Sequence, residues 1–339
     1  MSNPHFVERK SCPVCGSVDH RELFHGSYTE PPIRSWLEKR QAPRGMVEFD
    51  LLEGAEYVLL ECRSCALIFQ RDIPDEYLSE IAYERWVDPD KAWDRRSKGI
   101  IRARGRYALE IMGVLDFMKR EPESLRFLDY GMGWGFWVEM ARAFAVDVYG
   151  LEPAASRNTR ASEQGLQVID VEKMNELSFD FINTEQVFEH LPEPYETAVQ
   201  LSQVLAPGGI LKISVPNSMR VKRHLKRGDW LKKGNPLNDV FPLQHINAFT
   251  HRSIIKLGER VGLEHVPIPA RLRYRYMPTW ERPSRLLKRT VGAHYRTLRD
   301  QTTVIWFRRG GALATAPTES GRVRRQHAEP AAKSSRRRG

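Results

Sequence analysis

The chain has 339 residues, of which 41% are hydrophobic, and this length suits one large domain together with a smaller one. Its net charge of +10 is uneven, because residues 271–339 carry 18 Lys/Arg against 4 Asp/Glu, whereas the rest of the chain carries 35 against 39. No apolar run approaches the roughly 20 residues that span a bilayer, which argues against a membrane-helix protein. The first ten residues lack the apolar stretch of a signal peptide, so we expect a cytoplasmic protein.

All four cysteines lie in the first 65 residues, as two C-x-x-C pairs that consist of Cys12 with Cys15 and Cys62 with Cys65. Four thiolates in two such pairs can close a tetrahedral zinc site, and a site with four protein ligands is structural. Two pairs of free thiols are the alternative, whereas disulfides do not fit a reducing cytoplasm. We therefore predict a zinc-ribbon-like module over residues 1–72.

Secondary structure in the first third of the chain is predicted in three places. Residues 56–61 and 66–70 are expected to form strands of the cysteine-rich module. Apolar residues then recur at helical spacing over residues 97–118. Residues 73–124 are accordingly predicted to be a helical connector between the module and the remainder of the chain.

From residue 125 the pattern alternates between short apolar strands and helices. The predicted strands are residues 126–129, 146–151, 168–169, 179–183, 210–215, 264–268 and 302–307. The predicted helices are residues 136–144, 159–164, 195–205 and 251–261. A turn at Pro207-Gly208-Gly209 is expected to stop the third of these helices. The alternation predicts a doubly wound α/β fold with a seven-stranded, mostly parallel sheet over residues 125–309.

Two segments depart from this alternation. Residues 217–250 are a basic insertion that is too long for an ordinary connection, and we expect a lid or substrate-binding element. Its basic residues are Arg220, Lys222, Arg223, Lys226, Arg227, Lys232 and Lys233. They could hold the phosphates of an anionic substrate, or they could form an ordinary solvated loop. Residues 310–339 lack periodicity and aromatic residues, and are predicted to be a disordered basic tail.

A glycine-rich turn, with the sequence D-Y-G-M-G-W-G over residues 129–135, lies between a predicted strand and a predicted helix. Glycines let the backbone approach a ligand closely, and the following helix offers free N–H groups. Glu152 ends the next strand, where an acid can accept hydrogen bonds from both hydroxyls of a ribose. Asp170, after the third strand, could accept an adenine amino group. A turn without a ligand and two plain surface acids are the alternatives.

These segments resemble the motifs of the class I S-adenosylmethionine-dependent methyltransferases, in order, from residue 97 to residue 308. The matching segments are 128–135, F-D-F-I at 179–182, E-H-L at 189–191, L-A-P-G-G at 205–209, Pro216-Asn217, and H-I-N-A-F-T at 245–250 followed by Gly262-Leu263. The resemblance implies the cofactor S-adenosylmethionine. It weighs against a nicotinamide dehydrogenase, for which no residues that handle a hydride can be named.

The resemblance also assigns roles to single residues. The turn with Asp129, Gly131, Gly133 and Gly135 would hold the methionine end of the cofactor. Glu152 would hold the ribose, and Asp170 would lie near the adenine. The floor of the site would be lined by Asn183, Thr184 and Gln186.

The cysteine pairs resemble the zinc ribbon that precedes the methyltransferase domain in several bacterial proteins, among them sugar C-methyltransferases. That group has C-P-x-C-G first and C-x-x-C-G-L-x-F second. Here the second segment runs from Cys62 to Phe69, with Ala66 where glycine is usual. The likeness implies a structural zinc ion held by Cys12, Cys15, Cys62 and Cys65.

The acceptor atom decides which residue must remove a proton, and histidine is the natural base near neutral pH. His190 follows the fourth strand and His245 follows the long insertion, so we expect one of the two, preferably His245, to act as the base. Structural histidines are the alternative for both. The sugar C-methyltransferases carry Tyr and Glu before this last histidine, whereas residues 242–244 here are Pro-Leu-Gln. O- and N-methylation therefore stay open beside C-methylation.

Three functions are compatible with the sequence. The first is methylation of a small-molecule or glycan acceptor, such as an anionic nucleotide-linked sugar. The second is RNA or protein methylation with docking through the zinc ribbon and the basic C-terminus, although the N-P-P-Y type of signature is replaced here by Asn-Thr-Glu-Gln at 183–186. The third is a degenerate scaffold, which the intact glycines disfavour. Residues 280–298 are expected to cover the sheet, with a membrane-surface helix as the alternative. The sequence leaves the oligomeric state open.

Overall fold

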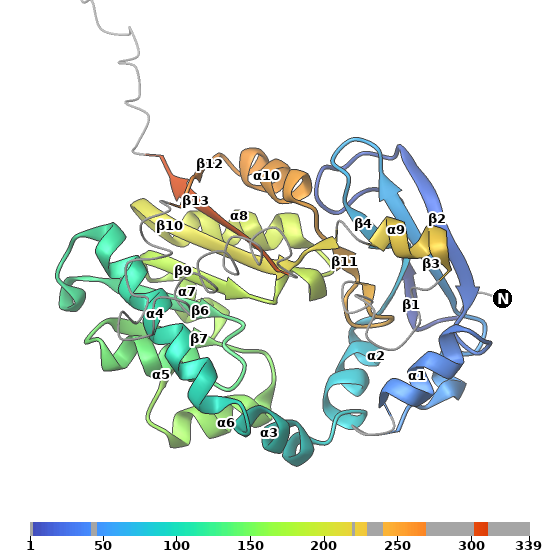
Figure 1. The fold of residues 1–339 in the computed structure, drawn as a ribbon, viewed down its shortest axis with the longest axis horizontal. Coiled ribbons are helices and arrows are strands. Elements are labelled where there is room, and N and C mark those ends of the chain that lie inside the picture. Colours follow the sequence, from blue (N-terminus) through green and yellow to red (C-terminus); the bar gives the residue numbers. More distant parts are fainter. Residues whose placement is uncertain (1–2, 42–45, 219–220, 229–239, 269–301, 311–339) are drawn as a thin grey trace, which may run out of the picture.

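The computed structural model describes residues 3–41, 46–218, 221–228, 240–268 and 302–310. Two sheets dominate it, a large one in the C-terminal two thirds and a smaller one built mainly from the N-terminus (Figure 1). Among the described residues, no helix has the length and apolar character needed to cross a membrane. The predictions for the tail at 311–339, for residues 280–298 and for Arg220, Lys232 and Lys233 lie outside the described residues.

The large sheet has seven strands in the order β12-β13-β10-β9-β6-β7-β8. Their bounds are β6 Arg126–Tyr130, β7 Asp147–Leu151, β8 Gln167–Val168, β9 Phe179–Glu185, β10 Leu205–Pro216, β12 Leu263–Val266 and β13 Thr302–Arg309. The pairs among β6 to β10 are parallel, and β13 runs antiparallel to both of its neighbours. The predicted fold class, a doubly wound and mostly parallel seven-stranded sheet, is confirmed.

Helices cover both faces of this sheet because its strands are apolar on both sides. Successive residues of a strand point to opposite faces, so Phe127 and Phe181 belong to one core, whereas Leu128 and Ile182 belong to another. The first core includes residues of α4 (Ile100–Met118), α5 (Phe136–Ala143) and α6 (Ala155–Glu163). The second includes residues of α7 (Val171–Asn175), α8 (Pro194–Val204) and α10 (His251–Arg260).

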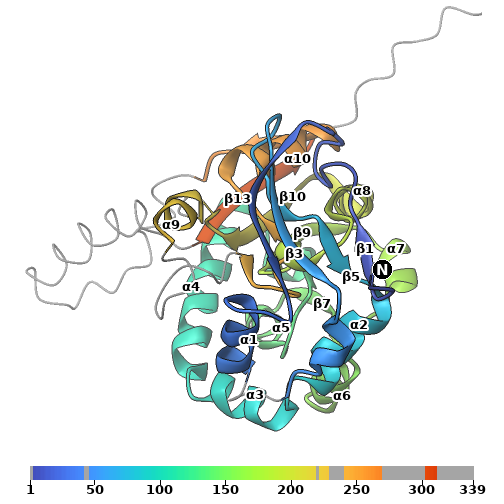
Figure 2. The ribbon, with the colours of Figure 1, turned by 90° about the vertical axis from the view of Figure 1, so that its right-hand side faces the viewer.

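One edge strand of the N-terminal sheet comes from a distant part of the chain, the segment before α10. Its order is β11-β4-β3-β2, with β2 His20–Ser27, β3 Glu56–Cys62, β4 Ile68–Gln70 and β11 Asn247–Ala248. The short strand β11 lies within the predicted insertion and pairs antiparallel with β4, Asn247 opposite Phe69. The end of the insertion therefore completes the sheet of the cysteine-rich module, which faces the viewer in Figure 2. The division into domains that the sequence suggests stays a prediction.

The remaining elements are short. They are β1 Phe6–Glu8, which pairs with β5 Asp72–Pro74, and α1 Ile33–Gln41, η1 Phe49–Leu52, α2 Glu76–Glu80, the π-helical turn η2 Ile81–Arg85, α3 Pro89–Ser97, η3 Pro122–Ser124, η4 Phe188–His190 and α9 Val221–Arg227. The predicted strands and helices of the large sheet shift at their ends by a few residues. The helix before the expected turn ends at Val204, and residues 207–209 lie at the start of β10, where the pairing with β9 shifts register between Leu205 and Ile210.

A buried arginine begins a chain of hydrogen bonds that links the N-terminal sheet to the loop after β9. Arg9 is 7% exposed, and its guanidinium donates to the carbonyl of Gln70 from Nε (2.9 Å) and Nη2 (2.6 Å). The same group donates to the side-chain oxygen of Asn247 at 2.8 Å and to the carbonyl of Ile246 at 2.7 Å. The Asn247 amide then donates to the carbonyls of Phe188 and Leu191, at 3.2 and 2.7 Å. One chain of hydrogen bonds thus runs from the N-terminus to the loop after β9.

We expect the substitution R9M to lower the free energy of unfolding by about 3 kcal/mol, because it leaves several buried oxygens without their donor. Urea unfolding, followed by circular dichroism, measures the change. The matched control is R63M, since the exposed Arg63 forms only a long, exposed ion pair with Asp19, at 3.7 Å. We expect R63M to change the free energy of unfolding by at most about 0.5 kcal/mol. Equal stability of the two variants would contradict the structural role of Arg9.

Candidate cofactor site and cysteine cluster

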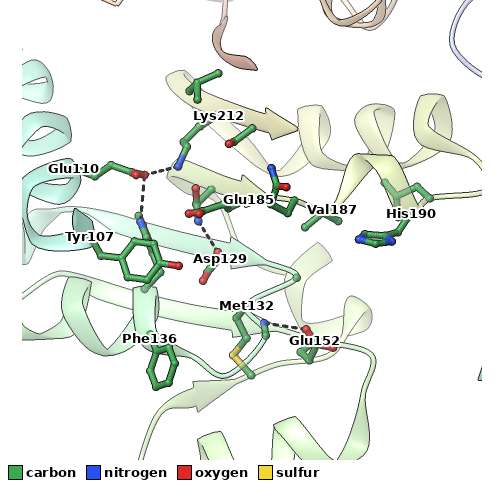
Figure 3. Close-up of a pocket in the computed structure, with 18 of the residues that line it drawn as sticks. Tyr107, Glu110, Asp129, Met132, Phe136, Glu152, Glu185, Val187, His190 and Lys212 are labelled. Atoms are coloured by element: carbon green, nitrogen blue, oxygen red, sulfur yellow. Dashed lines mark hydrogen bonds and ion pairs between the residues drawn. The ribbon is translucent and has the colours of Figure 1, made fainter. Parts of the chain in front are cut away.

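A cavity opens at the carboxyl ends of the central parallel strands, where ligands of such sheets bind. Its lining includes the glycine-rich turn after β6, Glu152 after β7 and residues at the end of β9 (Figure 3). In Figure 3, Glu110 and Lys212 lie at one end of the view and His190 at the other, with Met132 and Glu152 below. The structure therefore brings three of the predicted motifs to one place.

The turn after β6 requires glycine for two separate reasons. The backbone has positive φ at Gly131 (77°), Gly133 (57°) and Gly135 (75°), a region that other residues avoid. A Cβ atom at Gly131 would lie 2.5 Å from a methyl carbon of Val187, and one at Gly135 would lie 2.5 Å from a methyl carbon of Leu166. The turn thus passes close to two neighbouring segments and leads directly into α5.

Glu152 lies at the tip of β7 with 7% of its surface exposed, and it lines the cavity. Its Oε2 accepts a hydrogen bond from the Gly133 N–H at 2.9 Å, which ties the acid to the glycine-rich turn. Its Oε1 accepts from the Ala154 N–H at 3.2 Å and forms an ion pair with Arg157 at 3.1 Å. A ribose bound here would have to share this carboxylate with Arg157.

Asp129 is the most deeply buried acid of the predicted site. It is 3% exposed, and the Asn183 side-chain amide donates to its Oδ1 at 2.7 Å. Burial raises the pKa of Asp129 to about 7, although the hydrogen bond from Asn183 acts in the opposite direction. Beside it, the buried Lys212 ammonium forms a short ion pair with Glu110. Both Asp129 and Asn183 line the cavity.

The other predicted cofactor residues divide into two groups. Gln186 lines the cavity in a left-handed backbone conformation (φ 59°), and its N–H donates to the carbonyl of Ser214 at 2.8 Å. Thr184 is fully buried, and its hydroxyl donates to the carbonyl of Lys212. Asp170 is exposed and caps α7 by accepting from the Lys173 N–H at 2.7 Å. Thr184 and Asp170 lie outside the cavity lining, and their roles stay predictions.

The two predicted bases lie next to each other. The rings of His190 and His245 have centroids 4.7 Å apart and meet edge to face. His190 lines the cavity, and its Nδ1 is 2.8 Å from the carbonyl of Gln244; since a carbonyl only accepts, Nδ1 carries the proton. Burial lowers the pKa of His190 to about 4. Glu189, which the sequence argument left without a role, is 1% exposed and adjoins both histidines.

The insertion's basic residues do not reach the cavity in the part of the chain that the structure describes. Lys222, on α9, forms an ion pair with Glu61 of the N-terminal sheet at 2.6 Å. Neither it nor Arg223, Lys226 or Arg227 lines the cavity. The charged residues that the structure does place in the lining are Glu76, Glu80, Glu110, Asp129, Glu152 and Glu185, with Arg106, Arg157 and Lys212. The surplus of carboxylates suits a cationic ligand better than an anionic one.

The four cysteines form one cluster, as their spacing predicts. Their sulfur atoms all lie within 4.8 Å of one another, with 3.6 Å between Cys12 and Cys65 and 3.4 Å between Cys15 and Cys62. A zinc ion at 2.3 Å from four thiolates needs sulfur separations of about 3.8 Å, so the cluster fits the ion. The hydrogen bond between the two thiols lowers the pKa of Cys12 and raises that of Cys65, so the two sulfur atoms share a proton when no metal is bound.

Comparison with known proteins agrees with this geometry. Residues 102–268 match a family of methyltransferase domains. The chain carries a class I S-adenosylmethionine-dependent methyltransferase domain. The match begins inside α4 and ends after β12, so it contains the glycine-rich turn, Glu152 and both histidines.

The relatives of the methyltransferase domain include proteins named as an O-methyltransferase and as a C-methyltransferase. A ubiquinone biosynthesis O-methyltransferase from Nitrosococcus oceani is 32% identical over 27% of this chain and 44% of its own length. The C-methyltransferase NovU from Streptomyces niveus is 24% identical over 42% of this chain and 33% of its own length. An Archaeoglobus fulgidus S-adenosylmethionine-dependent methyltransferase structure is 15% identical, covers 69% of this chain and all of its own, and has a TM-score of 0.40. The chain thus spans less than half the length of either sequence relative.

We expect D129N to gain stability over the wild type as the pH rises. The carboxyl group ionises near pH 4 in the unfolded chain but near pH 7 in the folded one, so its ionisation destabilises the fold progressively between these values. The amide of D129N carries no such cost and can still accept from Asn183.

The measurement is urea unfolding of both proteins at pH 5 and pH 8. The difference in the free energy of unfolding should increase by roughly 2–3 kcal/mol in favour of D129N. D19N, which changes an exposed aspartate, serves as the control and should follow the wild type at both pH values. A constant difference between D129N and the wild type would contradict a raised pKa at Asp129.

Proposed function

We propose that this protein transfers a methyl group from S-adenosylmethionine to a hydroxyl-bearing small molecule or glycan, such as a sugar. The observation that carries the proposal is the joint between the glycine-rich turn and Glu152, in which the Gly133 N–H donates to the carboxylate. This joint places a close-packed backbone turn and a buried acid on the same cavity. The match of residues 102–268 to methyltransferase domains supports it.

The chain's own residues fit the cofactor at three points. The turn from Gly131 to Gly135 would hold the methionine end beside the start of α5, whose free N–H groups suit a carboxylate. Glu152 would accept hydrogen bonds from the ribose hydroxyls. The surplus of acidic residues in the lining would stabilise the sulfonium charge. When bound, the cofactor supplies an electrophilic methyl group.

The acceptor would enter near His190, at the end of the cavity away from Lys212 (Figure 3). The proton on Nδ1 of His190 places the ring's lone pair on Nε2, the atom suited to accept a proton. His245, the base that the sequence favours, stands edge to face against it but lies outside the cavity lining, so the geometry favours His190. Relatives named as an O-methyltransferase and a C-methyltransferase support a small acceptor. An anionic acceptor stays a prediction that the charges of the described lining do not favour.

The four-cysteine cluster is proposed to hold a structural zinc ion. Its sulfur atoms belong to the same buried core as α8 and α10 of the methyltransferase domain, so the ion would stabilise both parts. Four reduced thiols fit a cytoplasmic location, which we also propose.

The function is tested by calorimetry with S-adenosylhomocysteine, the demethylated product of the cofactor. We expect wild-type protein to bind it and E152Q to bind it at least about 10-fold more weakly, because the amide is a poorer partner for two ribose hydroxyls. E163Q, on the exposed end of α6, is the matched control and should bind as the wild type does. Folding of each variant is checked by its melting temperature. Absence of binding to a folded wild type would refute the proposal.

The zinc site is tested by metal analysis and by cobalt substitution. We expect one zinc per chain and, after exchange for Co²⁺, the intense thiolate-to-cobalt absorption of a four-sulfur site. C15S should lose both, since three thiolates cannot close the site, whereas S17A, in the same loop, should keep both. A zinc-free wild-type protein with a normal melting temperature would show that the thiols are free instead.

A further inference from the structure

One buried and two half-buried side chains form a second cluster of possible metal ligands, which the proposed methyl transfer does not require. Glu189, His190 and His245 each offer one ligand atom, and these atoms all lie within 4.8 Å of one another. The cluster unites two segments, the turn η4 after β9 and the end of the insertion before β11. It is distinct from the four-cysteine cluster, and one of its members, His190, lines the cavity.

We propose that Glu189, His190 and His245 bind one divalent first-row transition-metal ion at the acceptor end of the cavity. Two imidazoles and one carboxylate are a ligand set that such ions accept, and three protein ligands leave positions open for an exogenous oxygen. Glu189 is 1% exposed, and buried charges in proteins are paired or coordinate metal ions. Metal–ligand distances of about 2.1 Å correspond to separations of about 3.4 Å between ligand atoms in a tetrahedral site, so binding requires the three side chains to close around the ion.

The ligands are held in place by a shell of further hydrogen bonds, as metal ligands usually are. Nδ1 of His190 donates to the carbonyl of Gln244, which orients its ring. The amide of Asn247 donates to the carbonyls of Phe188 and Leu191, the residues on either side of Glu189 and His190. The amide of Gln70 donates to the carbonyl of His245 at 3.0 Å. Each ligand segment is therefore fixed by a buried amide or carbonyl.

Two of these supports come from the N-terminal sheet. Gln70 ends β4, and Asn247 belongs to β11, the strand that β4 pairs with. Arg9 contacts both of them, through the carbonyl of Gln70 and the side chain of Asn247. The cysteine-rich module would thus position the metal ligands.

The catalytic consequence rests on the proposed function. A hydroxyl oxygen of the acceptor that binds the ion loses its proton more readily, because the cation stabilises the oxyanion. The O–H bond breaks, its electron pair stays on oxygen and the proton passes to solvent. His190 and His245 would then hold the ion rather than accept the proton, and the acceptor would be an alcohol or a phenol.

The test is a Mn²⁺ titration, without any cofactor, of protein that retains one zinc ion per chain at the four-cysteine cluster, followed by the loss of the electron paramagnetic resonance signal of free Mn²⁺. Mn²⁺ favours oxygen ligands over thiolate and binds more weakly than Zn²⁺, so it leaves the zinc at the cysteines in place and reports on this cluster. We expect one Mn²⁺ per chain in the wild type. E189Q and H245N should each bind at least about 10-fold more weakly, with unchanged zinc content.

H265Q is the matched control, since His265 is an exposed histidine on another part of the cavity wall, and it should bind Mn²⁺ as the wild type does. A wild type without a Mn²⁺ site, or folded E189Q and H245N proteins that bind as tightly as the wild type, would overturn the metal site. The proposed function fails separately, through the absence of S-adenosylhomocysteine binding while Mn²⁺ still binds.

Discussion

The buried guanidinium of Arg9 is the interaction on which the arrangement of this molecule depends. It satisfies three oxygens from β4 and from the segment around β11, which lie far apart in the sequence. Because these oxygens are shielded from water, each would be costly without its donor. Separation of the two sheets would break the hydrogen bonds from Asn247 to the carbonyls of Phe188 and Leu191. The same hydrogen bonds position the loop after β9, which forms part of the cavity wall.

The joint explains why a cysteine-rich module accompanies a methyltransferase domain. The sulfur cluster lies in the same core as helices α8 and α10, and two arginines of α10 bind the cysteine loops. Arg252 donates to the carbonyl of Ser64 at 2.6 Å, and Arg260 donates to the carbonyl of Val14. A metal that orders these loops would thereby order the wall behind the acceptor end of the cavity, through Gln70 and His245.

The cavity has two chemically different ends. Around the glycine-rich turn, buried acids and backbone N–H groups suit a cationic nucleoside with a carboxylate. Around His190, a carboxylate and two imidazoles suit an oxygen that must lose a proton. Both ends lie at one edge of the sheet, so a methyl donor and an acceptor bound there would be held close together. Such proximity supplies much of the rate advantage in a displacement reaction.

The sequence by itself determined the features that depend on local pattern. Periodicity and spacing, which neighbouring residues dictate, predict the order of strands and helices, the glycine-rich turn and the clustering of the four cysteines. Asp170 shows a limit of this reasoning, since its position before a helix is also that of an N-cap, and its side chain caps α7. Residues 207–209 show a second limit, because proline and glycine mark both turns and irregular strand pairing.

Only the tertiary structure decided which distant segments meet. Gln70 and His245 are 175 residues apart, and Arg9 and Asn247 are 238 apart, yet each pair is joined by a hydrogen bond. Strand β11 has two residues, too few for any alternation to show. Glu189 reads as an ordinary polar residue until the fold buries it beside two histidines. Such contacts arise because burial of the whole core, and not the preference of any single segment, selects the arrangement in which these polar groups find partners.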